Sequence, residues 1–143
     1  MGGINVGRWL AGGVVAGIFT WLFEGAASLL YREDTETALE AMGKSLEMTG
    51  GTWALTVVVS LILGLALVFF YAAARPRFGP GPGTAIKVAI ALWLGGYLLH
   101  LLGYGMLEMY PTRLLVTWGI AGLVQMILAG LIGGWIYREV EAA

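Results

Sequence analysis

Two titratable side chains stand inside apolar runs of this sequence, where they could exchange a proton or hold a cation. Glu24 is the only charged residue of the run 9–31. His100 is the only histidine of the chain and lies in the uncharged run 88–107. A carboxyl and an imidazole at one site can form an ion pair or share a proton. Placing an ionised group at the centre of a membrane helix costs about 2.5–3.5 kcal/mol, so Glu24 needs a partner or a function.

The distance of these residues from the ends of their runs puts them at one depth. Each lies eight residues before the charge that closes its run, Arg32 or Glu108, which is about 12 Å at the helical rise of about 1.5 Å per residue. Ser60 lies eight residues after Thr52 on a helix of opposite direction and reaches the same level, while Gln125 falls near the midplane. The predicted intramembrane polar site, which has no catalytic residue and no metal ligand, consists of Glu24, His100, Ser60 and Gln125.

Two interpretations of this polar site remain open. In the functional one, Glu24 and His100 form a proton-linked or cation-binding site. In the structural one, they are polar contacts that hold the first membrane helix to the third. A haem ligated by His100 is a further option, but one histidine per chain would require a dimer or an open axial position.

The composition indicates which class of protein positions these groups. Hydrophobic residues make up 59% of the 143 residues and charged residues 12%, against roughly 45–50% and about 25% in soluble domains. This composition is therefore typical of an integral membrane protein rather than of a soluble enzyme or a disordered segment. It has no cysteine and one histidine, which excludes disulfides, thiolate chemistry and multi-histidine metal sites within one chain. The net charge of −1 gives no indication of a nucleic-acid partner.

Charged residues divide the sequence into four apolar runs, each long enough to cross about 30 Å of hydrocarbon as a helix. We expect an all-α fold: a single membrane domain, 1–143, in which four transmembrane helices form a bundle. The predicted spans are 9–31, 52–74, 88–107 and 114–137.

The distribution of basic residues predicts the orientation of the chain. Four spans place both termini on one side, together with the loop between the second and third helices. Five basic residues lie on that side and three on the other, which favours N- and C-termini in the cytoplasm. The five are Arg8, Arg75, Arg77, Lys87 and Arg138.

The first outer loop carries an amphipathic pattern over 34–48. Ala38, Leu39, Met42 and Leu46 share one face of a helix that Asp34 could cap. We expect a short amphipathic helix here, lying on the membrane surface or over the mouth of the bundle.

Glycine is unusually frequent, with 23 residues, and recurs at spacings of three and four within the runs. Small residues on one face let membrane helices approach closely, so these faces should point into the bundle or into a dimer interface. The predicted packing glycines are Gly13, Gly17, Gly64, Gly96, Gly103, Gly122, Gly130 and Gly133.

Several segments resemble a group of small bacterial four-helix membrane proteins to which no activity is assigned. They are Gly12 to Gly17, Glu24, Ala74 to Pro82, Pro111 to Leu115 and Tyr137 to Glu139. The resemblance implies a four-helix fold in a bacterial inner membrane. In size and in its membrane glutamate the chain is also loosely similar to the small multidrug resistance transporters, but the acidic outer loop and His100 depart from that pattern.

These observations lead to two functional hypotheses. The chain is a small proton- or cation-linked transporter, channel or binding protein that uses Glu24 and His100, and it forms a homo-oligomer because four helices leave little room for a pathway. Alternatively, it is an accessory or assembly subunit that docks on a partner membrane protein. An enzyme is the least favoured class, since the sequence carries no nucleophile–base motif and no phosphate loop.

Overall fold

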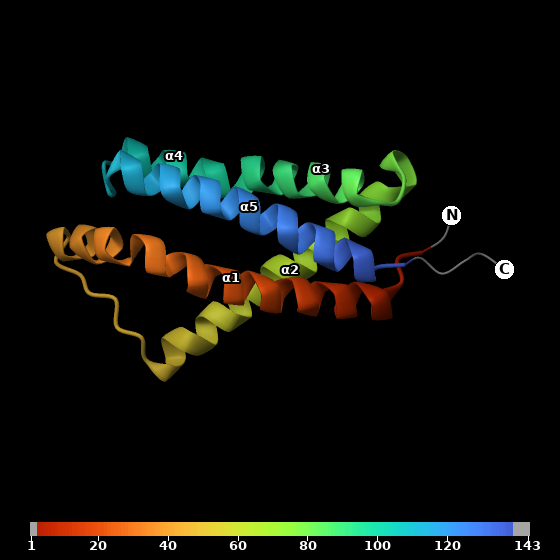
Figure 1. The fold of residues 1–143 in the computed structure, drawn as a ribbon, viewed down its shortest axis with the longest axis horizontal. Helices are drawn as coiled ribbons and strands as arrows, with labels where there is room; N and C mark the ends of the chain where they lie inside the picture. The colour runs from red at the N-terminus through yellow and green to blue at the C-terminus, as the bar shows by residue number, and fades with distance from the viewer. Residues whose placement is uncertain (1–2, 139–143) are drawn as a thin grey trace.

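The computed structural model describes residues 3–138, and every regular element within them is helical (Figure 1). The elements are α1 (Val6–Ala41), α2 (Gly50–Phe78), α3 (Pro82–Leu92), the π-helical segment η1 (Trp93–Leu98), α4 (Leu99–Met106) and α5 (Thr112–Ile136). Because α3, η1 and α4 follow one another without a break, they form one span, Pro82–Met106. Four helices of 36, 29, 25 and 25 residues are thus long and apolar enough to cross a membrane, which confirms this part of the prediction.

The helix ends follow from local side-chain chemistry. The side chain of Asn5 accepts a hydrogen bond from the backbone N–H of Arg8 and caps α1. Thr49 does the same for α2 through the N–H of Thr52, at 3.2 Å. Gly79, with φ of 80°, ends α2 in a conformation that favours glycine, and Pro82 opens α3.

The separate amphipathic helix expected over 34–48 is not found. Residues 34–41 continue α1 without interruption, and residues 44–49 are not helical. The predicted boundary near residue 31 carries no glycine or proline, and the turn there is reinforced by an ion pair of Arg32 with Glu36 at 2.7 Å. The helix ends instead before Gly43, whose φ is 69°.

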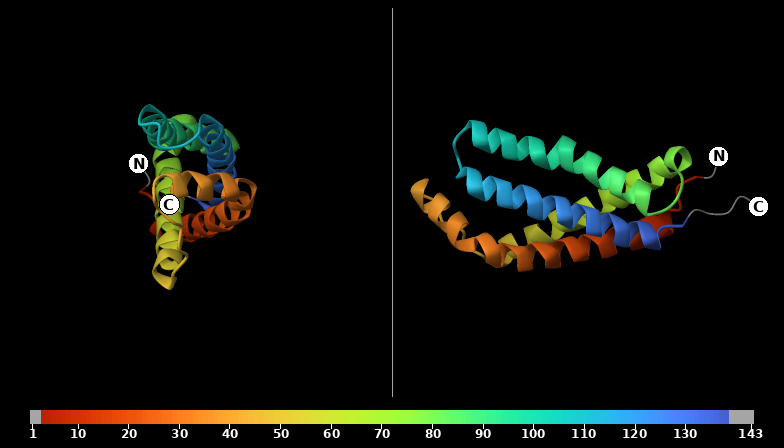
Figure 2. Two further views of the ribbon diagram at one scale, coloured as in Figure 1. Left: turned by 90° about the vertical axis from the view of Figure 1, so that its left-hand side faces the viewer. Right: turned by 45° about the horizontal axis from the view of Figure 1, so that its top comes forward.

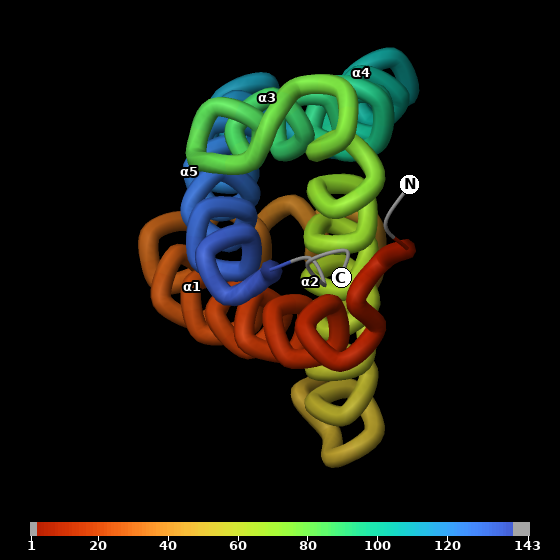
Figure 3. The backbone as a smooth tube through the Cα atoms, turned by 90° about the vertical axis from the view of Figure 1, so that its right-hand side faces the viewer, coloured from red at the N-terminus to blue at the C-terminus, as the bar shows by residue number. Residues whose placement is uncertain are grey.

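The four spans form a bundle, and each span occupies one of its corners. Viewed from the end that carries both termini, α1 and the α3–α4 span occupy opposite corners, with α2 and α5 between them (Figure 3). α1 packs on α2 and α5, and the α3–α4 span also packs on α2 and α5. We call the end with the termini and the α2–α3 turn the termini end, and the other the distal end.

The contact of α1 with α2 near the termini end is made between backbones. Gly64 of α2 lies directly on Gly13 and Gly17 of α1, and a Cβ at position 64 would overlap the carbonyl oxygen of Gly13. A Cβ on Gly13 would in turn stand 2.9 Å from the Cα of Leu65. Small residues at this crossing let the two helices approach each other closely.

The other predicted packing glycines divide into two sets. Gly133 is pressed against Gly12 and Val68, a Cβ on Gly122 would stand 2.8 Å from the ring of Tyr97, and Gly130 is in ordinary contact with its neighbours. Gly96 and Gly103, by contrast, face open space, so their predicted role in packing within the chain is wrong. A π-helical turn holds more residues than an α-turn, so η1 rotates the positions after it away from the face that α-helical spacing predicts.

The buried side chains form two clusters. The larger includes Ala16, Leu67, Val68, Ala89 and Met126. The smaller gathers Ala27, Tyr31, Ala38 and Leu114 towards the distal end of α1. The first turns of α2 diverge from α1, as Figures 1 and 2 show.

Candidate functional site

The carboxylate of Glu24 is held by two neutral donors. The hydroxyl of Tyr31 donates to Oε1, and Nε2 of Gln125 lies 3.5 Å from Oε2. The same amide nitrogen donates to the carbonyl oxygen of Thr20 at 2.9 Å. Gln125 is buried and belongs to α5, so its amide joins α5 to two successive turns of α1.

The helical spacing of α1 brings these groups together. Glu24 follows Thr20 by one turn and precedes Tyr31 by two, so all three lie on one side of the helix. The ring of Tyr31 is buried and packs edge-on against Trp118 of α5, with centroids 6.2 Å apart. Trp118 packs in turn on Tyr110 at 4.9 Å. This aromatic stack holds in place the hydroxyl of Tyr31, from which the carboxylate of Glu24 accepts a hydrogen bond.

The side of Glu24 away from these donors is exposed to a cleft between α1 and α2. The cleft has a volume of about 510 Å³, and Ser60 lies on its α2 wall. A second cavity of about 450 Å³ shares Glu24 and Trp53 with it and continues towards Arg32. Leu46 and Met48, from the segment between α1 and α2, line both.

Aromatic and hydroxyl groups form the walls of this cleft. The indole N–H of Trp21 donates to the hydroxyl of Thr56 across the two helices at 3.1 Å, and the rings of Trp21 and Trp53 pack edge-on at 6.0 Å. The bulk of these side chains keeps α1 and α2 apart at this level, where glycines bring them together nearer the termini. Glu24 therefore faces a space with apolar walls and a few hydroxyl groups.

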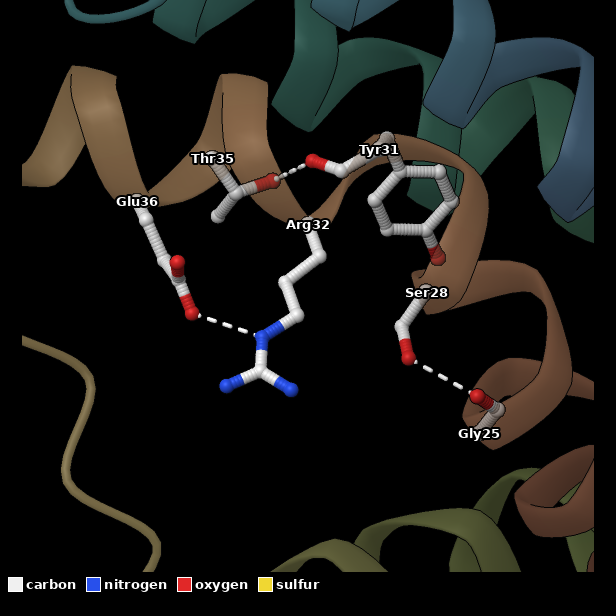
Figure 4. Close-up of polar contacts among 6 residues, drawn as sticks. All are labelled: Gly25, Ser28, Tyr31, Arg32, Thr35 and Glu36. Atoms are coloured by element: carbon white, nitrogen blue, oxygen red, sulfur yellow. Dashed lines mark hydrogen bonds and ion pairs between the residues drawn. The ribbon is translucent and has the colours of Figure 1, made fainter.

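The rim of the cleft carries its own charges (Figure 4). Arg32 points away from α1 and pairs with Glu36 on the next turn. Ser28 donates to the carbonyl of Gly25 and Thr35 to that of Tyr31, so both hydroxyls satisfy their own helix. Within residues 3–138 the Arg32–Glu36 pair is the one salt bridge, and the contacts of Glu24 are with neutral groups.

The structure brings together three of the four predicted site residues and separates the fourth. Glu24 and Ser60 line one cleft, and Gln125 bonds to Glu24. His100 is exposed on α4, with Nδ1 2.7 Å from the carbonyl oxygen of Gly96.

The predicted pairing of Glu24 with His100 is therefore not found. Equal depth does not ensure contact, because the two residues stand on helices at opposite corners of the bundle (Figure 3). The rotation introduced by η1 also turns His100 away from the bundle interior. Within residues 3–138, no three side chains of the His, Cys, Asp or Glu type come together as metal ligands would.

Three contributors were not among the predicted site residues: Tyr31, Trp21 and Trp53. The sequence places Tyr31 on the same stripe as Glu24, at a spacing of seven, which is the signal that could have identified it. Its position near the end of the span instead suggests an aromatic at the membrane interface. Trp21 and Trp53 carry no comparable signal, because their juxtaposition depends on how α1 crosses α2.

No protein-family profile, curated protein or solved structure matches this chain. The resemblance to small bacterial four-helix membrane proteins stays a prediction.

Proposed function

We propose that this chain is a small multi-pass membrane protein that binds a proton or a cation at Glu24, as a proton- or cation-linked transporter, channel or binding protein. The observation that carries the proposal is the environment of the carboxylate. Two neutral groups, Tyr31 and Gln125, hold it from one side, and its other side faces an open cleft.

This arrangement favours reversible binding of a proton or a cation at Glu24 over a permanent ion pair. The neutral donors offset part of the cost of placing an acid among apolar helices, but they bring no positive charge. A carboxylate so placed takes either a proton or a cation to complete its neutralisation. Arg32, at the rim, is already paired with Glu36, so the cleft retains one net negative charge from Glu24.

The geometry supports access from the distal end. The two cavities run from Ser60 past Glu24 to the rim at Arg32. Towards the termini, the backbone contact of Gly64 with Gly13 and Gly17 closes the space between α1 and α2. Passage through the whole bilayer then requires that this crossing open, or that a second copy in a homo-oligomer complete the pathway.

The charge distribution supports an orientation with both termini in the cytoplasm of a bacterium and the distal end outside its inner membrane. The termini end carries five basic residues and the distal end three. The bias follows the positive-inside rule. In this orientation the cleft opens to the outer half of the bilayer.

Proton movement in reconstituted vesicles tests the proposal. The full chain is inserted into liposomes that contain a pH-sensitive dye, and a potassium diffusion potential, negative inside, drives proton entry. We expect uptake above that of protein-free vesicles for the wild type and for Glu40→Gln, a matched change of an acid on α1 outside the cleft. Glu24→Gln, which keeps the shape of the side chain, should lower uptake to the protein-free rate.

Unchanged proton uptake in Glu24→Gln vesicles would overturn the proposal. Circular dichroism and gel filtration of the same preparations show whether the variant has kept its fold.

A second candidate function is that of an accessory or assembly subunit, and the outward face of the α3–α4 span favours it. Gly96 and Gly103 face open space there, and His100 is exposed among apolar residues. Small residues and a polar side chain are the means by which membrane helices associate. Purification in mild detergent should then yield one partner membrane protein in fixed ratio, lost in Gly103→Leu; recovery of this chain alone would contradict it.

A further inference from the structure

The cleft around Glu24 has a lining that restricts which cation it can hold. Its volume of about 510 Å³ lies within the range of about 300–1,000 Å³ that is usual for small-molecule pockets. Leu22, Leu46 and Met48 contribute apolar side chains to the walls, and Glu24 is the one charged residue among the described residues that line it. A ligand that fills this space therefore needs an apolar body as well as a positive charge.

The donor set of the cleft does not suit a metal ion. Ca²⁺ takes about six to eight oxygen ligands, and Mg²⁺ keeps several waters around it. The cleft offers one carboxylate, and part of its hydroxyl set is already bonded. The hydroxyl of Thr56 accepts from Trp21 and donates to the carbonyl oxygen of Trp53. That of Ser28 donates to Gly25. A metal ion would have to keep its water shell against apolar walls.

The carboxylate of Glu24 keeps acceptor sites for an N–H donor. An ionised carboxylate has about four lone-pair sites. Tyr31 donates to Oε1, whereas the amide of Gln125 lies 3.5 Å from Oε2, which is long for such a hydrogen bond. The amide gives its closer bond, of 2.9 Å, to the carbonyl oxygen of Thr20. Oε2 can therefore accept a stronger, charge-assisted bond from a cationic donor.

Indole rings line the cleft together with this carboxylate. Trp21 of α1 and Trp53 of α2 pack edge-on at 6.0 Å, and Trp53 is 49% exposed. Trp118 lines the second cavity, which shares Glu24 and Trp53 with the cleft. The face of a tryptophan ring attracts a cation, and more strongly where water is excluded. The carboxylate and the rings can thus act on the same positive charge.

We propose that the cleft binds a protonated organic amine that carries an aromatic or branched apolar body. An N–H of the ammonium group donates to Glu24, and the body lies against Trp21 and Trp53. The inference rests on the proposed function, since it names the class of cation that Glu24 takes. An ammonium group without N–H lacks the hydrogen bond, and an alcohol of the same shape lacks the charge, so both bind less tightly.

Isothermal titration calorimetry of the full chain tests the assignment, in phosphatidylcholine nanodiscs at pH 7 with empty nanodiscs as the blank. Phenethylamine is the probe, and phenethyl alcohol, phenethyltrimethylammonium and methylamine each lack one of its features. We expect phenethylamine to bind at least about tenfold more tightly than each of them, since hydrogen bonds to charged groups contribute more than neutral ones. Equal binding of phenethylamine and the alcohol would overturn the inference, as would tighter binding of Mg²⁺ or Ca²⁺.

Two variants and two matched controls locate the site. Glu24→Gln should bind phenethylamine no better than the alcohol, and Trp53→Leu should weaken binding about fivefold, the size of one cation–π contact. Glu40→Gln changes an acid of α1 outside both cavities, and Trp135→Leu changes an indole of α5 outside both; each should bind as the wild type does. Unchanged binding in Glu24→Gln, or an equal loss in Trp135→Leu, would contradict the site. The comparison of ligands on the wild type does not depend on the folding of any variant.

The inference and the proposed function fail in different ways. If Glu24→Gln lowers proton uptake but the wild type binds phenethylamine no better than the alcohol, the organic-amine inference is overturned and Glu24 remains a proton site. If amine binding depends on Glu24 and Trp53 while proton uptake is unchanged in Glu24→Gln, the proposed proton movement is overturned and the cleft remains an amine-binding site.

Discussion

The two halves of the α1–α2 pair differ in what separates the helices. Near the termini end, Gly13 and Gly17 face Gly64, and the backbones touch. Towards the distal end the same two helices diverge (Figure 1). The rings of Trp21 and Trp53 pack against each other there and line a cleft of about 510 Å³. The same pair of helices is therefore closed where its facing residues are small and open where they are large.

This difference explains where the chain tolerates an acid. In the closed half the facing side chains are apolar or absent, and a carboxylate would lose its hydration without a partner. In the open half Glu24 reaches the donors Tyr31 and Gln125 on one side and the cleft on the other. A closely packed half and an open half thus lie along a single helix.

The largest expected effect comes from filling the closed half. Gly64→Leu would force side-chain atoms into the backbone of α1 and should destabilise the fold by about 3 kcal/mol or more, the upper range for overpacking. Unfolding followed by circular dichroism in detergent measures this effect. Gly103→Leu, which enters open space, is the control and should leave the unfolding midpoint unchanged. Equal stability of the two variants would contradict the backbone contact.

A smaller effect is expected from removing one donor in the open half. Tyr31→Phe keeps the ring against Trp118 but deletes the hydroxyl that donates a hydrogen bond to Glu24. A hydrogen bond within a protein contributes about 0.5–1.5 kcal/mol net, so we expect a loss in that range. The same variant should alter proton uptake in the vesicle assay, because the carboxylate loses a support. Wild-type stability together with wild-type uptake would show that Tyr31 does not hold Glu24.

The smallest effect is expected at the rim. The Arg32–Glu36 pair is exposed and spans one helical turn, and such exposed pairs contribute little to stability. Glu36→Gln should therefore change stability little, but it leaves Arg32 without its carboxylate at the mouth of the cleft. We expect slower proton uptake in the vesicle assay than for Glu40→Gln, and restoration of the rate in the double variant Arg32→Gln/Glu36→Gln. Equal rates in all three would show that the rim does not influence access.

Much of the scaffold was predictable from residue patterns. Four long apolar runs lead directly to four membrane-length helices, because a helix satisfies its own backbone hydrogen bonds in hydrocarbon. Gly13, Gly17 and Gly64 were identified as packing residues by their spacing, and a Cβ on any of them would overlap the backbone of the facing helix. The end of α1 was less predictable, since the polar residues after Arg32 are compatible with both a loop and a longer helix.

The candidate site was predictable in its members on α1, α2 and α5 but not in its partners. Spacing along a helix predicts the depth of Glu24, Ser60 and Gln125 and the helix face on which each lies. In the structure, Glu24 and Ser60 line one cleft and Gln125 contacts Glu24. It does not state which helices are neighbours, so it could not show that Tyr31, and not His100, meets the carboxylate.

The sequence by itself determined that this chain has four apolar spans, that one carboxylate lies within them, and that glycines stand where two helices cross. These properties depend on composition and on the fixed rise of a helix. Only the tertiary structure decided that Glu24 faces an open cleft and that His100 lies elsewhere. The order of helices around the bundle and the rotation added by η1 set those contacts, and neither is encoded in the spacing of residues along one helix.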